Sequence, residues 1–384
     1  MRRMTLSAAV LGMLFSLSTP LLAHDSKRLS AQTIAARQKY LGVDNVDAKT
    51  GAVRSDRVIL SWVGVSSFVA AFNGHVVFLD AYVVRAGGFP GAPWAGIRYS
   101  GTTIAELASL RPELILFGHA HFDHMGDLPD VVRANPDAVL AGTAEHCRDI
   151  KDEVRDVSFR CIPMFPERAD LGGMRELPRD VVPGVEFTAI KQPHSSAPKD
   201  PVADPPIPLG PAACKTTPGL AIADYPVQPD DPTSWDFATA GPPSGIIAVA
   251  WQIRVGDFAL LWQDTAGYIM GNCAVRGEVG CDRVPQALAS LPETDVRIGS
   301  IVVSGRSVFS QHTSVVKEKL FIPVHHDACG YMAKKAFDEL VAKLPAEIRP
   351  RVMFLSDPSD YLKPLVFDPA AKAWRDHGRL GDDD

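Results

Sequence analysis

The amino-acid sequence predicts an α/β protein in which two sheets pack face to face and helices cover the outside. The predicted core opens with a β-meander at residues 58–79, and strands then alternate with helices. This order returns more loosely in the second half of the chain, from residue 185 onward. Because a sheet must bury its apolar face, a meander followed by alternating units, twice over, is typical of two stacked sheets.

The meander is predicted from three apolar segments. Strands are expected at Val58–Val63, Ser67–Phe72 and His75–Leu79, where β-branched and aromatic residues favour extended backbone. The dipeptide Asn73-Gly74 separates the last two segments. Residues of this kind adopt the positive φ angles that a tight hairpin turn requires.

The other elements follow from hydrophobic periodicity and short apolar runs. In the first half we expect a helix at Thr102–Leu110, a strand at Glu113–Phe117, a helix at Asp127–Asn135 and a strand at Ala138–Ala141. In the second half we expect strands at Val185–Lys191, Gly245–Val255, Phe258–Trp262, Ile298–Ser304 and Leu320–Val324, with helices at Val284–Leu291 and Tyr331–Leu344.

The first residues have the layout of a signal peptide. Arg2 and Arg3 precede a short apolar stretch, which is followed by Pro20 and by the small residue Ala23. Residues 1–23 are therefore expected to be removed, leaving a periplasmic or secreted chain, with a retained membrane anchor as the alternative. No later stretch is long and apolar enough to cross a bilayer, so we expect no stable membrane insertion after removal.

The mature chain is expected to have one main domain. Residues 24–57 are predicted to form an N-terminal arm with a helix near Leu29–Tyr40, residues 58–365 the domain, and residues 366–384 a C-terminal tail. Within the domain we expect a proline-rich insertion at about residues 197–244, because proline blocks regular helices and central strands. Such an insertion is either a flap over a functional site or a passive surface loop.

Charge and cysteine content restrict the possible partners. The net charge is −6 at pH 7, and no basic block is long enough to track a phosphate backbone, so nucleic acid is not expected. The six cysteines lie beyond the predicted signal, but no two have the spacing of a zinc knuckle. Disulfides are allowed, with Cys273–Cys281 as the most plausible local pair, and buried free thiols are the alternative. The oligomeric state is left open.

The segment most indicative of chemistry is G-H-A-H-F-D-H-M-G-D, which directly follows a predicted buried strand. Histidine and aspartate are costly to bury unpaired, whereas such donors at a strand end are what a divalent metal requires. In extended backbone His119 and His121 point to the same side and can reach one ion. Asp123 and His124 follow at the start of a helix and can face a second ion.

This segment matches the H-x-H-x-D-H signature of the metallo-β-lactamase superfamily, and the chain resembles that superfamily over most of residues 58–360. The resemblance implies a four-layer αββα sandwich with two mixed sheets, and two zinc ions per chain. It implies further ligands at later strand ends: His194 on the first ion, Asp264 bridging both ions, and His325 on the second, with His326 as the alternative to His325.

The resemblance also assigns supporting roles. Asp80, His326 and Asp327 are expected to lie behind the ligands, since metal-bound histidines usually donate their other N–H group to a carboxylate or carbonyl. Asp123 and Asp264 are expected to be catalytic as well as metal-binding. The segments S-W-V-G-V-S-S-F, Q-D-T-A-G and P-V-H-H-D look closest to the branch of ascorbate-phosphate lactonase and N-acyl-phosphatidylethanolamine phospholipase D relatives. That branch commonly has a histidine where this chain has Val65.

The sequence thus predicts an exported dinuclear zinc hydrolase. A metal-activated water is expected to cleave an ester, lactone, amide or phosphodiester bond of a small molecule or lipid. A β-lactamase-type hydrolase is the second enzyme hypothesis, although such enzymes generally lack the bridging carboxylate that Asp264 supplies. A redox di-iron protein and a non-catalytic metal-binding protein are the remaining alternatives. The di-iron relatives usually carry a carboxylate where His121 stands, and non-catalytic members tend to have lost ligands.

Overall fold

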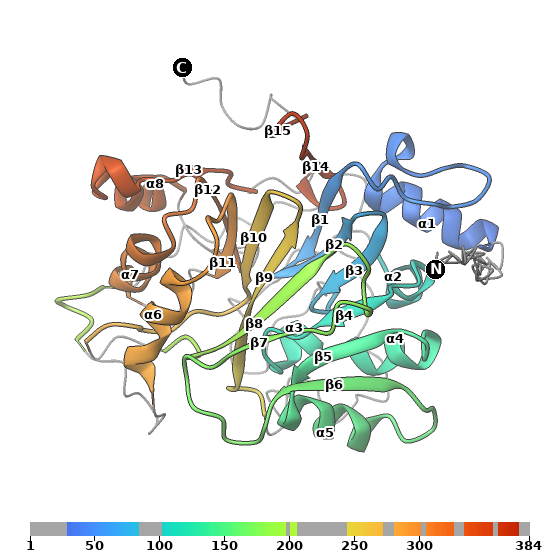
Figure 1. Ribbon diagram of the computed structural model, residues 1–384, viewed down its shortest axis with the longest axis horizontal. Helices are drawn as coiled ribbons and strands as arrows, with labels where there is room; N and C mark the ends of the chain where they lie inside the picture. The colour runs from blue at the N-terminus through green and yellow to red at the C-terminus, as the bar shows by residue number, and fades with distance from the viewer. Residues whose placement is uncertain are drawn as a thin grey trace, which may run out of the picture.

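A computed structural model describes residues 29–83, 102–196, 200–205, 244–271, 280–300, 305–325, 334–355 and 360–375. The predicted signal peptide, most of the predicted insertion and the end of the predicted tail lie outside these ranges. Within them the chain forms two sheets packed against each other, with helices on both outer faces (Figure 1). None of the described helices is long and apolar enough to span a membrane.

The first sheet is mixed. Its described strands are β1 (Val58–Gly64), β2 (Ser67–Phe72), β3 (His75–Leu79), β4 (Leu114–Leu116), β5 (Val139–Thr143), β6 (Arg160–Phe165), β14 (Leu365–Asp368) and β15 (Ala373–Trp374). They lie in the order β15-β14-β1-β2-β3-β4-β5-β6. Strands β1 to β3 pair antiparallel, as the predicted meander requires, and β3 to β6 pair parallel.

The second sheet is also mixed. Its described strands are β7 (Met174–Glu176), β8 (Glu186–Gln192), β9 (Ala248–Val255), β10 (Phe258–Gln263), β11 (Val296–Ser300), β12 (Leu320–Val324) and β13 (Arg351–Val352). They lie in the order β13-β12-β11-β10-β9-β8-β7. Strands β7 to β10 pair antiparallel, and β10 to β13 pair parallel.

Helices cover the outer face of each sheet. Beside the first sheet lie α1 (Ala31–Leu41), α2 (Ile104–Ser109), α4 (Leu128–Ala134) and α5 (Ala144–Glu153), and beside the second lie α6 (Val284–Ala289), α7 (Arg306–Val316) and α8 (Lys334–Ala342) (Figure 1). The short helix α3 (Phe122–Met125) follows β4, and 3-10 turns occur at Val43–Asn45, Cys281–Arg283 and Ala346–Ile348.

The alternation along β1 shows how the layers are held. Val58, Leu60 and Trp62 point into the core between the two sheets, whereas Ile59 and Val63 pack under the helices of the first sheet. A strand that is apolar on both faces is expected where both faces are buried. The four-layer αββα sandwich with two mixed sheets is therefore confirmed.

Several elements were not predicted. Helix α5 is mostly polar in sequence and starts where the Thr143 side chain accepts a hydrogen bond from the His146 backbone N–H. Strand β6 contains Pro163, which suits an edge strand only, and α7 is rich in serine, threonine and valine, which are poor helix formers. Strands β14 and β15 continue the first sheet into the expected tail, because Leu365 and Phe367 are buried beside β1.

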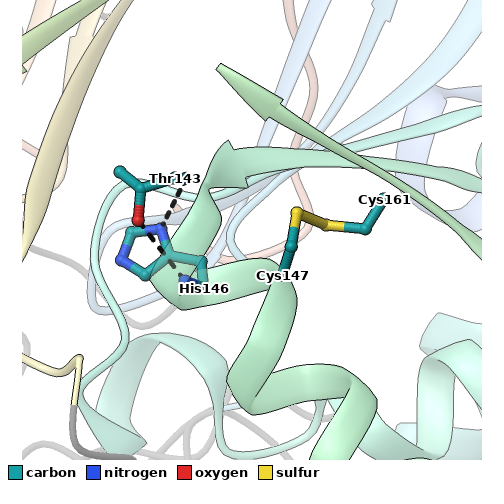
Figure 2. Close-up of a disulfide and its surroundings, with 4 residues drawn as sticks. All are labelled: Thr143, His146, Cys147 and Cys161. Carbon is teal, nitrogen blue, oxygen red and sulfur yellow. Dashed lines mark hydrogen bonds between the residues drawn. A yellow bond between two sulfur atoms is a disulfide. The ribbon is translucent and has the colours of Figure 1, made fainter. Parts of the chain in front are cut away.

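A disulfide joins Cys147 on α5 to Cys161 on β6, with 5.7 Å between the Cα atoms (Figure 2). Cys281 is also disulfide-bonded. The described cysteines are therefore not free thiols. Cys273 lies outside the described residues, so the Cys273–Cys281 pair stays a prediction.

Candidate metal centre

The predicted ligands meet at one edge of the sandwich, where strands of both sheets end. The loop after β4 and the helix α3 carry four of them, and the loops after β8, β10 and β12 carry one each. Ligand atoms within this set approach to within 4.8 Å of one another in groups of three. The residues concerned are His119, His121, Asp123, His124, His194, Asp264 and His325.

The first group of three consists of His119, His121 and His194. The Nε2 atom of His119 lies 3.1 Å from the Nδ1 atom of His121, and the ring of His194 lies with its centroid 4.7 Å from both other rings. His119 is buried, while His121 and His194 are half-buried. Three imidazoles converging in this way are suited to one zinc ion with an open fourth position.

The second group consists of Asp123, His124 and His325. The Oδ2 atom of Asp123 lies 3.0 Å from Nε2 of His325, and its Oδ1 atom lies 3.7 Å from Nε2 of His124. Asp123 and His124 come from α3, as the sequence predicts, whereas His325 follows β12 in the other sheet. This group can hold a second ion only because the two sheets are packed together.

Asp264 lies between the two groups. Its Oδ2 atom contacts Nδ1 of His119 and lies 3.5 Å from Nδ1 of His124, one residue from each group. Its Oδ1 atom is buried and has no hydrogen-bond partner of good geometry among the described residues. A buried carboxylate oxygen of this kind needs a partner, and a cation between the groups would provide it. The residues therefore fit a pair of bound metal ions.

A glycine makes room for this carboxylate. A Cβ atom on Gly118 would lie 1.9 Å from the Cγ atom of Asp264, so a larger residue cannot stand at the start of the histidine-rich loop. The Gly118 carbonyl also accepts a hydrogen bond of 2.7 Å from the backbone N–H of Val249, and the Phe117 carbonyl accepts one of 2.7 Å from Nε1 of Trp251. Both donors lie on β9, so the second sheet fixes the loop.

Burial sets the charge state of the site. Burial and the neighbouring imidazoles hold the pKa of His119 and of His124 well below the ordinary value, so both rings are neutral, as a metal ligand must be. Burial raises the pKa of Asp264. Although burial opposes it, the hydrogen bond from His325 helps to hold the pKa of Asp123 below its ordinary value.

Asp80 lies beside His124 and Gly118, and its role in supporting the ligands stays a prediction. Its Oδ2 atom lies 2.8 Å from Nδ1 of His124, and its Oδ1 atom accepts a hydrogen bond of 3.2 Å from the Gly118 N–H. The Ser66 hydroxyl donates to Asp80 over 2.9 Å and lies 2.7 Å from the same His124 nitrogen. Nε2 of His124 is thereby left to face the second group. His326 and Asp327, the other predicted supports, lie outside the described residues.

The turn between β1 and β2 holds the last ligand. The carbonyl of Val65 accepts a hydrogen bond of 2.9 Å from the N–H of His325 and one of 3.1 Å from Nε1 of Trp62. Val65 has a φ of 49°, which is unusual for a β-branched residue. Neither Ser66 nor this role of Val65 was predicted, and the serine-rich segment after β1 was the only available signal.

No protein-family model matches the chain. The chain is similar to proteins described as UPF0173 metal-dependent hydrolases. One from Pyrobaculum neutrophilum is 32% identical over 94 residues, which make up 24% of this chain and 36% of the relative. One from Polynucleobacter asymbioticus is 26% identical over 170 residues, which make up 43% of this chain and 51% of the relative. The matches thus span between about a third and a half of these relatives' length.

Among solved structures, the chain is similar to Igni18, a metallo hydrolase from Ignicoccus hospitalis. The identity is 16%, the match covers 81% of this chain and 98% of that one, and the TM-score is 0.49. The fold itself follows from the chain's own layers and strand order. That fold, the histidine-rich segment and the similarity to metal-dependent hydrolases bear out the resemblance to the metallo-β-lactamase superfamily. The branch within it stays a prediction.

Proposed function

We propose that the chain is an exported, dinuclear zinc hydrolase that cleaves an ester, lactone, amide or phosphodiester bond of a small molecule or lipid. The observation that carries the proposal is the convergence of seven histidine and aspartate side chains into overlapping groups whose ligand atoms lie within 4.8 Å. Their donors are imidazole nitrogens and carboxylate oxygens, which suit zinc. Two groups joined by one carboxylate suit two ions.

Two zinc ions held there would polarise the scissile bond and lower the pKa of a shared water towards about 7. The chain's own residues would do the rest. Asp123 is the acceptor to which the attacking water can donate, because its carboxylate lies between His124 and His325 at the second group. Asp264, fully buried between the groups, would fix the distance between the ions.

The exposure of the ligands indicates where substrate enters. His119, His124 and Asp264 are buried, while His121, His194 and His325 are half-buried. Substrate would therefore approach over the three half-buried imidazoles and find the carboxylate of Asp264 beneath them.

Export is supported by two observations. Residues 1–23 have the layout of a signal peptide. The described cysteines are disulfide-bonded, which is common in oxidising compartments and rare in reducing ones. Cell fractionation with an antibody to the chain tests this part: a periplasmic or medium fraction is expected, and a chain confined to the cytosol would contradict it.

Metal analysis tests the centre itself. Mass spectrometry of the purified mature chain is expected to find about two zinc ions per chain, a stoichiometry proposed from the two groups. Asp123→Ala and His325→Ala should lose metal. The matched control is His75→Ala, since His75 is half-buried and pairs with Glu113 on the first sheet, outside the ligand groups. Iron in the parent would favour the redox alternative, and no metal in the parent would overturn the proposal.

A substrate screen follows from the same preparation. Lactones, phosphodiesters and β-lactams are offered to the zinc-loaded chain, with Asp123→Ala as the inactive reference. Turnover of a lactone or phosphodiester supports the proposed reaction. Turnover of β-lactams alone would favour the β-lactamase hypothesis.

A further inference from the structure

We propose that a network of buried polar side chains beneath the metal centre positions His194 and Asp264. The network would thereby set how tightly the metal is bound. The network consists of Gln192, Gln263, His312, Arg297 and Glu318. None of them is a predicted ligand, and the proposal rests on the metal centre proposed above. These residues act through the ligands and are positioning residues.

The two glutamines join strands that are not neighbours. Gln192 is the last residue of β8 and Gln263 the last residue of β10, with β9 between them. Nε2 of Gln263 donates to Oε1 of Gln192 over 2.7 Å. The span is possible because β9 presents the small side chain of Ala250 in the same buried cluster as Ile190 of β8 and Leu261 of β10.

Each glutamine lies within two residues of a candidate ligand in the sequence. Gln263 directly precedes Asp264, and Gln192 lies two residues before His194. Nε2 of Gln192 donates to the carbonyl of Thr265 over 2.6 Å, so the β8 strand end is tied to the loop that carries Asp264. The two loops therefore have a fixed spacing below the ligands.

Further hydrogen bonds join the same loops. The N–H of Ser195 donates to Oγ1 of Thr265 over 3.0 Å, and the N–H of Gly267 donates to the Pro193 carbonyl over 3.0 Å. A Cβ atom on Gly267 would lie 2.3 Å from the His194 carbonyl, which shows how closely the loops approach. His194 and Asp264 are thus held as one unit.

On the side away from the ligands, the network ends in a buried ion pair between Arg297 and Glu318. Nε and Nη2 of Arg297 donate to Oε1 of Glu318 over 2.9 and 2.7 Å, and Nη1 reaches Oε1 of Gln263 at 3.4 Å. The guanidinium lies over the ring of Phe321, 4.3 Å from its centroid. Arg297 is 2% exposed and Glu318 is 3% exposed, so neither can relax into solvent.

His312 of α7 closes the network. Its Nδ1 atom accepts from Nε2 of Gln263 at 3.2 Å, and its Nε2 atom donates to the Gly267 carbonyl over 3.0 Å. Both nitrogens of the neutral imidazole ring are therefore hydrogen-bonded. Burying polar side chains at this density is costly unless they are hydrogen-bonded. Oε2 of Glu318 has no hydrogen bond among the described residues, but Gln192 and His312 both donate to carbonyls of the loop that follows Asp264. Plain core packing would need no such connection.

The experiment measures metal affinity, not turnover. Metal-free wild type, Gln263→Met and Gln192→Met are titrated with Co²⁺ against a competing chelator, and the Co²⁺ absorption spectrum is recorded. Substitution of the residues that support metal ligands through hydrogen bonds typically lowers metal affinity about 10- to 100-fold. We expect a loss of that size in both variants, with a changed spectrum because His194 and Asp264 no longer hold their geometry.

The matched control is Gln252→Met. Gln252 is buried on β9 and donates to the Pro292 carbonyl over 3.0 Å and to Thr294 over 3.4 Å, away from the ligand loops. It should melt earlier but bind Co²⁺ like the wild type. Thr265→Val is a milder second test, since it removes the hydrogen bond from Ser195 with little change of volume, and it should weaken Co²⁺ binding in the same direction.

The outcomes separate this inference from the proposed function. If the wild type binds Co²⁺ and the glutamine and threonine variants bind it equally well with the same spectrum, the positioning role is wrong and the metal centre stands. If Gln252→Met loses as much affinity as Gln263→Met, the effect is general destabilisation and the inference is overturned. If the wild type binds no Co²⁺, the proposed metal centre itself is wrong, and the inference falls with it.

Discussion

Asp80 holds the imidazole ring of His124 in place, although Asp80 itself is not a predicted metal ligand. Its carboxylate lies 2.8 Å from Nδ1 of His124 and also holds the Gly118 N–H. Asp80→Asn removes the negative charge behind the imidazole, so the ring becomes a weaker donor to metal. We expect metal affinity to fall about 10- to 100-fold, measured by chelator competition. An unchanged affinity would show that Ser66 alone suffices to orient the ring.

Gly118 leaves no room for a side chain beside Asp264. A Cβ atom there would overlap the Asp264 carboxylate at 1.9 Å. Gly118→Ala is expected to cost about 1–3 kcal/mol of unfolding free energy through overpacking, and to reduce bound metal because Asp264 must move. Urea unfolding and metal analysis check this. Gly173→Ala is the control, because its Cβ would meet nothing closer than 3.3 Å; equal losses in both would contradict the argument.

The convergence of the candidate ligands could be predicted from sequence, but their surroundings could not. Histidine and aspartate clustered at a strand end rarely serve packing alone, and the spacing of His119, His121, Asp123 and His124 is itself informative. Ser66 and Gln263 are ordinary polar residues in sequence. They acquire their positions only when β1 meets α3 and when β8 and β10 flank β9, and such long-range pairings leave no local pattern.

Helix α5 is the element that ties the first sheet to the start of β9. Asp149 accepts hydrogen bonds from the Ser244 backbone and hydroxyl, and His146 donates to the Ile247 carbonyl over 2.9 Å. The disulfide between Cys147 and Cys161 fastens this helix to β6, as Figure 2 shows. The helix thus supports the segment that leads to Val249, whose N–H holds the Gly118 carbonyl.

Removal of this disulfide should weaken the fold without emptying the site. The cysteines are 14 residues apart, and a closed loop of that size contributes about 3 kcal/mol. The variant Cys147→Ala/Cys161→Ala is expected to lose about 2–4 kcal/mol in urea unfolding, with metal content preserved because neither cysteine touches a ligand. Equal unfolding midpoints for variant and wild type would show that the other contacts of α5 suffice to hold the helix in place.

Elements with a strong hydrophobic pattern could be predicted from sequence, whereas elements that form because of tertiary contacts could not. Strands β1 to β3 carry continuous apolar runs and a turn dipeptide, and their expected bounds agree with the structure within a residue. Helix α7 has little intrinsic helix propensity. It forms because Val308 and Phe309 are buried and because Asp204 accepts from the N–H of Ser307 in its first turn.

At the scale of the whole molecule, the centre is a product of sheet packing. Strands β4, β8, β10 and β12 end at the same edge, and their ligands come within reach only when the core between the sheets is closed. Trp62, Trp251 and Trp262 are buried in that core, and their indole N–H groups bond to Val65, Phe117 and Ser66 beside the ligands. Packing of the core therefore positions the backbone segments beside the candidate ligands.

The same closure makes stability depend on pH. His146 and His312 are fully buried, and burial lowers the pKa of each to about 3, with Lys191 facing His146 and Arg297 facing His312. Their pKa in the unfolded chain is about 6.5. The unfolded state therefore binds more protons below that value, so stability is complete above about pH 6.5 and falls as the pH decreases towards 3.

Each histidine is expected to cost about 2 kcal/mol at pH 5 relative to neutral pH. In metal-free protein His119 and His124 act in the same direction. His75, whose pKa is raised by Glu113, acts in the opposite direction, and so do Asp80 and Asp264, whose pKa is raised by burial. Urea unfolding of metal-free protein at pH 7.5 and pH 5 measures the sum, and His312→Gln and His146→Gln isolate single contributions, since each should flatten the pH dependence by about 2 kcal/mol. Variants that keep the wild-type slope would mean that these rings gain protons without opening the core, and that burial does not hold them neutral.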